Sequence, residues 1–194
     1  MRKVILPNLK SLLMFENKKI LITGGTGSLG TALTTRLLTT DVDTIRIFSR
    51  DELKQSQMES HFNDERLRFL IGDVRDKERL EKAVEDVNIV IHTAALKQVP
   101  VIEYNPFEAI KTNVQGSQNL VDACLEKDVE FALAIGTDKA VSPFNTYGAT
   151  KLLMERLFVS ANYHKGSHKT KFSCVRYGNV LGSRGSIVPK FIEQ

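Results

Sequence analysis

Residues 18–38 read KKILITGGTGSLGTALTTRLL, and this stretch decides the fold class. An apolar, β-branched run at 18–23 leads directly into a GxGxxG pattern at 25–30, and a helical pattern begins at once from Ser28. The glycines permit a tight turn and a close approach of the backbone, so a pyrophosphate can rest on the helix N-terminus and its free N–H groups. A glycine-rich turn without a ligand is the alternative. The Walker phosphate loop is excluded, because no Gly-Lys-Ser/Thr sequence follows.

Short β-branched runs alternate with helical patterns along the rest of the chain. Strands are predicted at 18–23, 44–48, 66–71, 88–93, 130–135 and 170–176. Helices are predicted to begin near Ser28, Asp51, Lys77, Phe107, Asn145 and Ile187. This alternation predicts a doubly wound parallel α/β sheet of the Rossmann type with about six strands, over residues 15–194. Residues 1–14 stand outside the pattern as an N-terminal extension, and a substrate domain is largely absent.

Length and composition are those of one globular domain, with 194 residues, 42% of them hydrophobic and 26% charged. The net charge of +4 suits a solvated surface, a phosphate-rich ligand or nucleic acid. No basic run is interleaved with aromatic residues, so a nucleic-acid partner is not expected. Cys124 and Cys174 lie in apolar patterns and are predicted to be buried thiols of a reducing compartment. Without a signal peptide or a membrane-length apolar run, the protein is expected to be cytoplasmic.

The end of the second predicted strand bears on the choice of dinucleotide. NAD-specific domains usually place an acidic residue there, to bind the ribose 2′-hydroxyl. Here Ser49 and Arg50 occupy that place, with Lys54 one helical turn further, and a hydroxyl with cations suits the 2′-phosphate of NADP. In the alternative interpretation Arg50 is a surface residue and Asp51 binds the ribose of NAD.

Tyr147 and Lys151 lie four residues apart and therefore share one face of a predicted helix. An ammonium beside a phenol favours the phenolate, so Lys151 is expected to lower the pKa of Tyr147 toward working pH. The same lysine can hold the nicotinamide ribose. Alone, the pair is compatible with polar residues on a helix surface; after a GxGxxG strand and a strand ending in Gly136-Thr137, it indicates catalysis.

Together, TGGTGSLG, GTDKA and YGATK resemble the extended short-chain dehydrogenase/reductase superfamily. Longer blocks at 48–58, 92–120, 137–162 and 175–189 are similar to the inverting UDP-N-acetylglucosamine 4,6-dehydratases, which begin pathways to pseudaminic acid and related surface sugars. The resemblance runs from Met14 to the end of the chain. Two departures stand out: Gly136 replaces a more usual serine, and family members continue for well over a hundred further residues.

The resemblance implies a mechanism for a UDP-sugar substrate. Tyr147 would take the proton of the 4-hydroxyl as hydride passes from C-4 to NADP. Lys139 would then remove the acidified C-5 proton, and a protonated Asp138 would donate to the departing 6-hydroxyl. An apolar pocket would raise the pKa of Asp138, while the nicotinamide charge and Lys151 would lower that of Lys139. An exposed loop ion pair is the alternative interpretation of Asp138 and Lys139.

The resemblance also implies binding roles. The residues assigned to NADP are Gly25, Thr26, Gly27, Ser28, Ser49, Arg50, Lys54, Asp73, Val74, Ala95, Lys97, Tyr147, Lys151 and Val180. Those assigned to the substrate are Lys97, Thr137 and Asn179, and Arg184 in the same glycine-rich loop suits a diphosphate. His92 is expected to be a packed strand residue, and no side chains show the spacing of metal ligands.

The predicted activity has rivals of two kinds. Within the superfamily these are a UDP-sugar 4-epimerase, disfavoured by the Asp-Lys pair, and a C-5-retaining dehydratase, a type often anchored to membranes. The rival from another class is a non-catalytic NADP-binding module, against which the Tyr147/Lys151 pair argues. The full-length form is expected to be a homo-oligomer. The present 194 residues are expected to bind NADP but to turn over little UDP-sugar.

Overall fold

The computed structural model describes residues 14–180. The predicted six-stranded parallel sheet is confirmed, with the order β3-β2-β1-β4-β5-β6. Its strands are β1 (Lys19–Thr23), β2 (Thr44–Ser49), β3 (Leu67–Ile71), β4 (Ile89–His92), β5 (Phe131–Ile135) and β6 (Lys171–Val175). The order reverses between β1 and β4, which is the switch point where open sheets of this type bind ligands.

Helices connect the strands, and five of the predicted helix starts are confirmed to within one residue. The elements are α2 (Ser28–Leu37), α3 (Glu52–Phe62), α4 (Lys77–Val84), α5 (Val99–Tyr104), α6 (Pro106–Ala109), the π-helix η1 (Ile110–Gln115), α7 (Gly116–Glu126), the 3₁₀-helix η2 (Asp138–Ala140) and α8 (Thr146–His164). The sequence did not predict α5, η1 or η2. The helix predicted near Ile187 lies outside the described residues.

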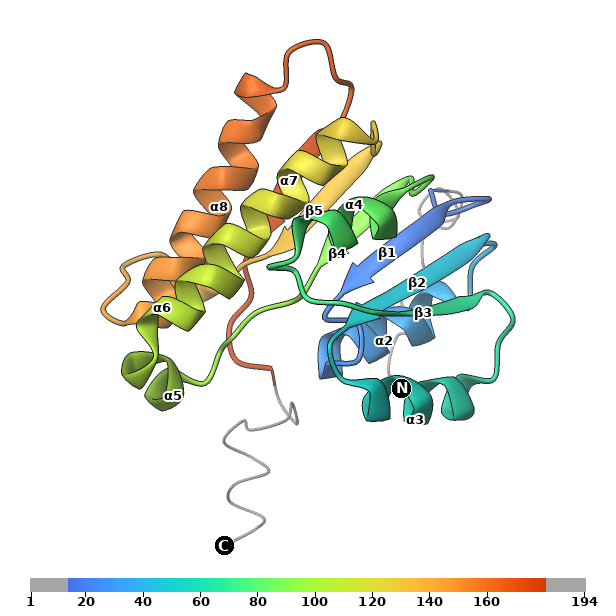
Figure 1. The fold of residues 1–194 in the computed structure, drawn as a ribbon, viewed down its shortest axis with the longest axis horizontal. Helices are drawn as coiled ribbons and strands as arrows, with labels where there is room; N and C mark the ends of the chain where they lie inside the picture. Colours follow the sequence, from blue (N-terminus) through green and yellow to red (C-terminus); the bar gives the residue numbers. More distant parts are fainter. Residues whose placement is uncertain (1–13, 181–194) are drawn as a thin grey trace, which may run out of the picture.

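Two apolar layers hold the helices to the two faces of the sheet. Successive side chains of β1 point to opposite faces of the sheet. Ile20 and Ile22 pack in one apolar cluster, and Leu21 packs in the other. The first layer lies under α2 and α3, and the second under α4, α7 and α8 (Figure 1). The sheet is thus covered on both faces, as the near-continuous apolar strands require.

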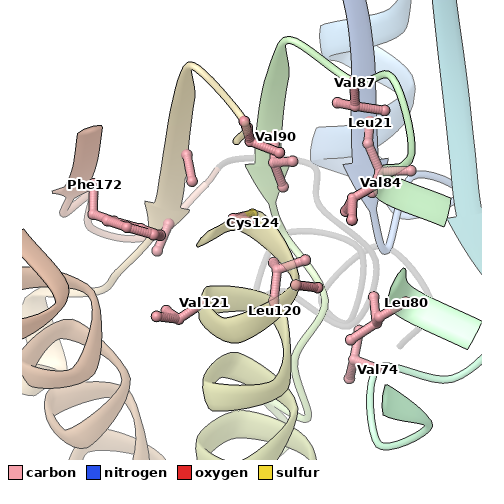
Figure 2. Packing of buried hydrophobic residues seen from close by; sticks show 14 of the residues in the cluster. Leu21, Val74, Leu80, Val84, Val87, Val90, Leu120, Val121, Cys124 and Phe172 are labelled. Atoms are coloured by element: carbon pink, nitrogen blue, oxygen red, sulfur yellow. The ribbon is translucent and has the colours of Figure 1, made fainter. Parts of the chain in front are cut away.

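The second layer is the larger one and fixes α7 against the centre of the sheet. Leu120 and Cys124 of α7 are fully buried and lie near Val90 of β4 (Figure 2). Cys124 is therefore buried as predicted, whereas Cys174 is only partly buried. Burial raises the pKa of the Cys174 thiol to about 11. Within residues 14–180, no helix combines the length and apolar character needed to cross a bilayer.

Candidate active site

The glycine turn after β1 is shaped by backbone contacts that leave no room for side chains. Gly24 has a φ of +67°, and a Cβ on it would lie 2.8 Å from Ala94 Cα. A Cβ on Gly30 would collide with the Gly25 backbone, so α2 can pack closely on the end of β1 only because residue 30 is glycine. α2 begins at Ser28, and its N-cap residue Gly27 provides no side-chain hydrogen bond, so the N-terminus of the helix lies directly at this turn.

A cavity of about 350 Å³ lies at the carboxyl ends of β1 to β4. Seven of the residues predicted to bind NADP line it: Thr26, Ser49, Arg50, Lys54, Asp73, Val74 and Ala95. Gly25 is buried beneath the turn, and Gly27 and Ser28 are exposed at the start of α2. The structure therefore brings together side chains from four strand ends, as the topology predicted.

The cavity wall at the end of β2 carries two cations, Arg50 and Lys54, each paired with a carboxylate that also lines the cavity. Asp51 caps α3 by accepting from Lys54 N at 3.0 Å, and its other oxygen forms an ion pair with Lys54 Nζ. The Arg50 side chain is 54% exposed, and its Nη1 lies 3.4 Å from Asp73 Oδ2. Burial opposes ionisation of Asp73, but hydrogen bonds from Arg75 outweigh it and hold the pKa of Asp73 below its usual value.

Thr112 in η1 also lines this cavity, and sequence reasoning missed it. It is 5% exposed, and its Oγ1 is the one buried side-chain polar atom among the described residues that lacks a hydrogen-bond partner. Leaving a buried hydroxyl unpaired costs stability, so such atoms are rare unless a ligand satisfies them. The cavity thus fits a ligand with polar groups.

The segment after β5 carries the predicted acid and base. Gly136 N donates to Val175 O at 2.6 Å and Asp138 N donates to Tyr177 O at 3.1 Å, which ties this segment to the end of β6. Asp138 Oδ1 accepts from Thr137 Oγ1 at 3.0 Å and from Lys139 Nζ at 3.1 Å. Lys139 Nζ also donates to Asn179 Oδ1 at 3.2 Å.

The raised pKa expected for Asp138 is wrong for this structure. The Asp138 side chain is 54% exposed, so no apolar pocket surrounds it. Hydrogen bonds from Lys139 and Thr137 hold the pKa of Asp138 below its usual value. Asp138 and Lys139 accordingly form the partly exposed ion pair of the alternative interpretation.

Tyr147 sits in the first turn of α8, which Asn145 caps by accepting from Gly148 N at 2.8 Å. Burial raises the pKa of Tyr147, and the Thr137 side chain opposes this only in part. The lowered pKa expected from Lys151 is therefore wrong for this structure. Lys151 is 3% exposed, its Nζ donates to Met154 Sδ at 3.0 Å, and burial lowers its pKa to about 8.

The side chain of Glu155 explains why position 136 is a glycine. A Cβ on Gly136 would collide with Glu155 Oε1 and lie 2.9 Å from Val175 O. Glu155 is held there by Arg176, whose Nη2 donates to Glu155 Oε2 at 2.6 Å. The buried carboxylate thus occupies the space that a side chain at position 136 would need.

The remaining predicted residues lie at the edges of the site. Lys97 is exposed on the segment between β4 and α5, and Val180 is 45% exposed immediately after Asn179. Arg184 lies outside the described residues. The described side chains contain no group of three or more His, Cys, Asp or Glu residues that could hold a metal ion.

A model of the polysaccharide biosynthesis protein family matches residues 20–194. The chain belongs to this family. An inverting UDP-N-acetylglucosamine 4,6-dehydratase of Campylobacter jejuni subsp. jejuni serotype O:23/36 (strain 81-176) is 58% identical over 179 residues, or 92% of this chain and 54% of the relative. A UDP-glucose 4-epimerase of Rickettsia rickettsii (strain Sheila Smith) is 46% identical over 185 residues, or 93% of this chain and 54% of the relative.

The X-ray structure of Pen from Bacillus thuringiensis superposes with a TM-score of 0.91 at 44% identity, covering 93% of this chain and 56% of Pen. These similarities confirm the fold class and the resemblance to inverting dehydratases drawn from the motifs. The chain spans about half the length of the curated relatives that it matches.

Proposed function

We propose that this chain carries the dinucleotide site and the proton-transfer residues of a UDP-N-acetylglucosamine 4,6-dehydratase that inverts C-5. The observation that carries the proposal is one hydrogen-bonded cluster at the carboxyl edge of the sheet. Thr137 Oγ1 donates to Asp138 Oδ1, and Lys139 Nζ donates to Asp138 and Asn179. Tyr147 stands beside this group, since the Thr137 side chain counteracts part of the burial that raises the pKa of Tyr147. The cluster thus joins a phenol, a carboxyl group and an amine, the three groups that a dehydration with a keto intermediate needs.

The cofactor in this proposal is NADP. Arg50 and Lys54 supply positive charge beside the cavity, where a 2′-phosphate would accept charge-assisted hydrogen bonds. The capping role of Asp51 disfavours the alternative in which its carboxylate binds the ribose of NAD. The start of α2 would hold the pyrophosphate, and Thr112 Oγ1 would find a partner on the dinucleotide. When bound, NADP supplies an acceptor that takes hydride from C-4 of the sugar and returns it to C-6.

The side chains of the cluster move the protons. Tyr147 removes the proton of the 4-hydroxyl as the C-4 hydride leaves for the dinucleotide. The two losses together give a ketone at C-4, which makes the C-5 hydrogen acidic. Lys139 takes the C-5 proton, and Asp138 gives a proton to the 6-hydroxyl, so water leaves across C-5 and C-6. A proton delivered to C-5 from the opposite face completes the inverted 4-keto-6-deoxy product.

The ion pair between Asp138 and Lys139 is the resting form of this acid and base. A bound sugar covers the pair and excludes water, which disfavours both charges. Transfer of one proton from the amine to the carboxylate then yields the neutral base and the protonated acid. The partial exposure of the two side chains, at 33% for Lys139 and 54% for Asp138, leaves them open to substrate.

A 4-epimerase is the second candidate, because a protein of that name in Rickettsia rickettsii is 46% identical. An epimerase needs neither an acid nor a base for loss of water, so the Asp138–Lys139 pair favours the dehydratase. The test is mass spectrometry of UDP-N-acetylglucosamine incubated with the full-length enzyme and NADP in D₂O. Loss of water with deuterium at C-5 supports the dehydratase, and NMR of the product gives the configuration at C-5. A product of unchanged mass that is epimeric at C-4 refutes it.

A further inference from the structure

The proposed cofactor turn and the proposed catalytic helix are joined by buried polar groups that the mechanism does not use. His92, at the end of β4, is completely buried and its ring stacks on Phe158 with centroids 5.9 Å apart. Its Nδ1 lies 2.7 Å from Thr23 Oγ1, and its Nε2 lies 3.1 Å from Ser117 Oγ. The expectation that His92 is a packed strand residue is therefore confirmed, but both ring nitrogens also have partners.

The partners of Ser117 determine which ring nitrogen carries the proton. Ser117 Oγ donates its hydrogen to the main-chain oxygen of Asn113 at 2.7 Å. A hydroxyl has one hydrogen, so Ser117 Oγ must accept from His92, and Nε2 must carry a proton. Burial lowers the pKa of His92 to about 3, so the ring is neutral and Nδ1 accepts from the Thr23 hydroxyl.

Asn113 continues the connection to α8. Its Nδ2 donates to Thr150 Oγ1 at 3.1 Å, and Thr150 Oγ1 donates to the main-chain oxygen of Tyr147 at 3.0 Å. The Asn113 side chain also pairs with both the N–H and the oxygen of Leu96, at 2.8 and 2.9 Å, which fixes its orientation. Asn113 lies in η1, and π-helical turns of this kind occur often at functional sites.

One buried path therefore runs from Thr23 through His92, Ser117, Asn113 and Thr150 to Tyr147. Thr23 is the last residue of β1 and directly precedes Gly24, whose N–H donates to Phe48 O at 2.7 Å. The path thus begins at the entry to the glycine turn and ends in the first turn of α8. Every donor in it points the same way, and every buried polar atom in it has a partner, which makes the arrangement rigid.

We propose that His92, protonated on Nε2, is a positioning residue that holds the glycine turn and α8 at the spacing needed to bind both ends of one dinucleotide. This inference rests on the proposed function, because it takes the turn and α8 as the two ends of the cofactor site. His92 itself touches neither the cofactor cavity nor the proton-transfer cluster. It acts through Thr23 on one side and through Asn113 and Thr150 on the other.

The first test reads the tautomer of His92 directly. We expect ¹⁵N NMR of the histidine-labelled chain to show one ring that stays neutral and protonated on Nε2 from pH 5 to pH 8. Sequential assignment in the wild-type chain identifies that ring as His92. A neutral ring protonated on Nδ1 would reverse the direction of donation, and a charged ring would offer no acceptor to the Thr23 hydroxyl. Either result would overturn the proposal.

The second test asks whether the path acts as a unit on cofactor binding. Thr23→Val and Ser117→Ala each remove one link at a residue that does not itself line the cavity. Ser117→Ala is the cleaner of the two, because Thr23 Oγ1 also accepts from Ala94 N, a lining residue, at 3.5 Å. We expect each to raise the Kd for NADP about three- to tenfold, and the double variant to raise it no further than the weaker-binding single variant. Independent packing roles would instead give losses that add.

The matched control is Thr170→Val, which removes another buried threonine hydroxyl outside the path. Thr170 is fully buried, and its Oγ1 donates to Cys124 O at 3.4 Å, remote from the cofactor cavity. The Kd of the Thr170→Val variant for NADP is expected to equal that of the wild type. The proposal is overturned if Ser117→Ala and Thr23→Val bind like this control, or if their losses add.

Circular dichroism and thermal unfolding show whether each variant is folded. If one single variant does not fold, the other single variant and the NMR measurement decide the question.

The two proposals fail in different ways. If the wild-type chain binds no NADP, the proposed function fails, and the positioning role fails with it. If the wild type binds NADP and the path variants bind equally well, the positioning role alone is refuted.

Discussion

Lys139 Nζ lies 3.1 Å from Asp138 Oδ1, so the proposed base and acid are already in contact in the absence of substrate. Replacing Lys139 by alanine removes the amine that takes the C-5 proton. We expect formation of the 4-keto-6-deoxy product by the full-length enzyme to fall by roughly a hundredfold or more, the usual effect of losing a general base. NADP binding is expected to persist, because Lys139 does not line the cofactor cavity.

Product formation is followed by mass spectrometry, and NADP binding by calorimetry. Lys171→Ala is the control, since this lysine is exposed at the start of β6 and far along the strand from the cluster. Product formation by Lys139→Ala at the wild-type rate would show that another group removes the C-5 proton.

Arg50→Ala tests the choice of dinucleotide. Loss of a charge-assisted hydrogen bond to the 2′-phosphate is expected to weaken NADP binding by about 1.5–3 kcal/mol, while NAD binding stays unchanged. Calorimetric titration of the wild type and the Arg50→Ala variant with NAD and with NADP measures this difference. Arg36→Ala, at an exposed position of α2, is the control. Equal affinity of the wild type for NAD and NADP, or an Arg50→Ala variant that binds NADP normally, refutes the assignment.

Thr112→Val is expected to separate cofactor affinity from stability. The hydroxyl has no partner in the protein, so its replacement by a methyl group should leave the free energy of unfolding unchanged or raise it by about 1 kcal/mol. NADP affinity should fall about three- to tenfold, the loss of one neutral hydrogen bond. Denaturant unfolding and calorimetry measure the two effects, and Thr112→Ser is the control that keeps the hydroxyl. A variant that loses stability but not affinity would show that the hydroxyl has a structural role.

The sheet and most helix starts were predictable because they depend on local patterns. The apolar run before the glycines and the alternation of strands and helices fixed the topology, and asparagine and aspartate caps marked helix starts at Asn145 and Asp51. The π-helix η1 and the role of Thr112 in it were not predictable, because an i→i+5 turn leaves no periodicity of its own. Only the three-dimensional structure shows that this hydroxyl has no partner.

The electrostatic environment of the site was also beyond the sequence. Spacing placed Lys151 and Tyr147 on one helix face, but the direction of a long flexible side chain depends on tertiary packing. In the structure Lys151 Nζ lies beside Met154, and the exposure of Asp138 depends on what covers the end of the sheet. The sequence patterns predicted which side chains lie near one another, but they did not predict the protonation state of each side chain.

The buried Lys151 makes stability depend on pH in the absence of cofactor. Its pKa is about 8 in the folded chain, below the value of about 10.4 expected when unfolded. Between these values the unfolded chain binds more protons, so this residue's contribution to the free energy of unfolding rises as pH rises, by on the order of 2–3 kcal/mol in total. The Lys151→Met variant should lack this rise when the two chains are compared by denaturant unfolding at pH 7, 9 and 10. Parallel pH profiles of the two chains would contradict the lowered pKa.

Gly136→Ser should destabilise the chain, because its Cβ would collide with the carboxylate of Glu155. The expected loss in the free energy of unfolding is roughly 1–3 kcal/mol, typical of overpacking. A Glu155→Ala background removes the collision with the carboxylate but keeps the 2.9 Å contact with Val175 O. The same substitution should therefore still cost stability there, but less by about 0.5 kcal/mol or more. Gly178→Ser is the matched control, since a Cβ at that position meets only Asp138 Oδ2 at an ordinary 3.8 Å. Denaturant unfolding of the four variants and the wild type measures these differences. A cost for Gly136→Ser that matches the Gly178→Ser control, or that is unchanged when Glu155 is alanine, would show that the carboxylate does not exclude a side chain from position 136.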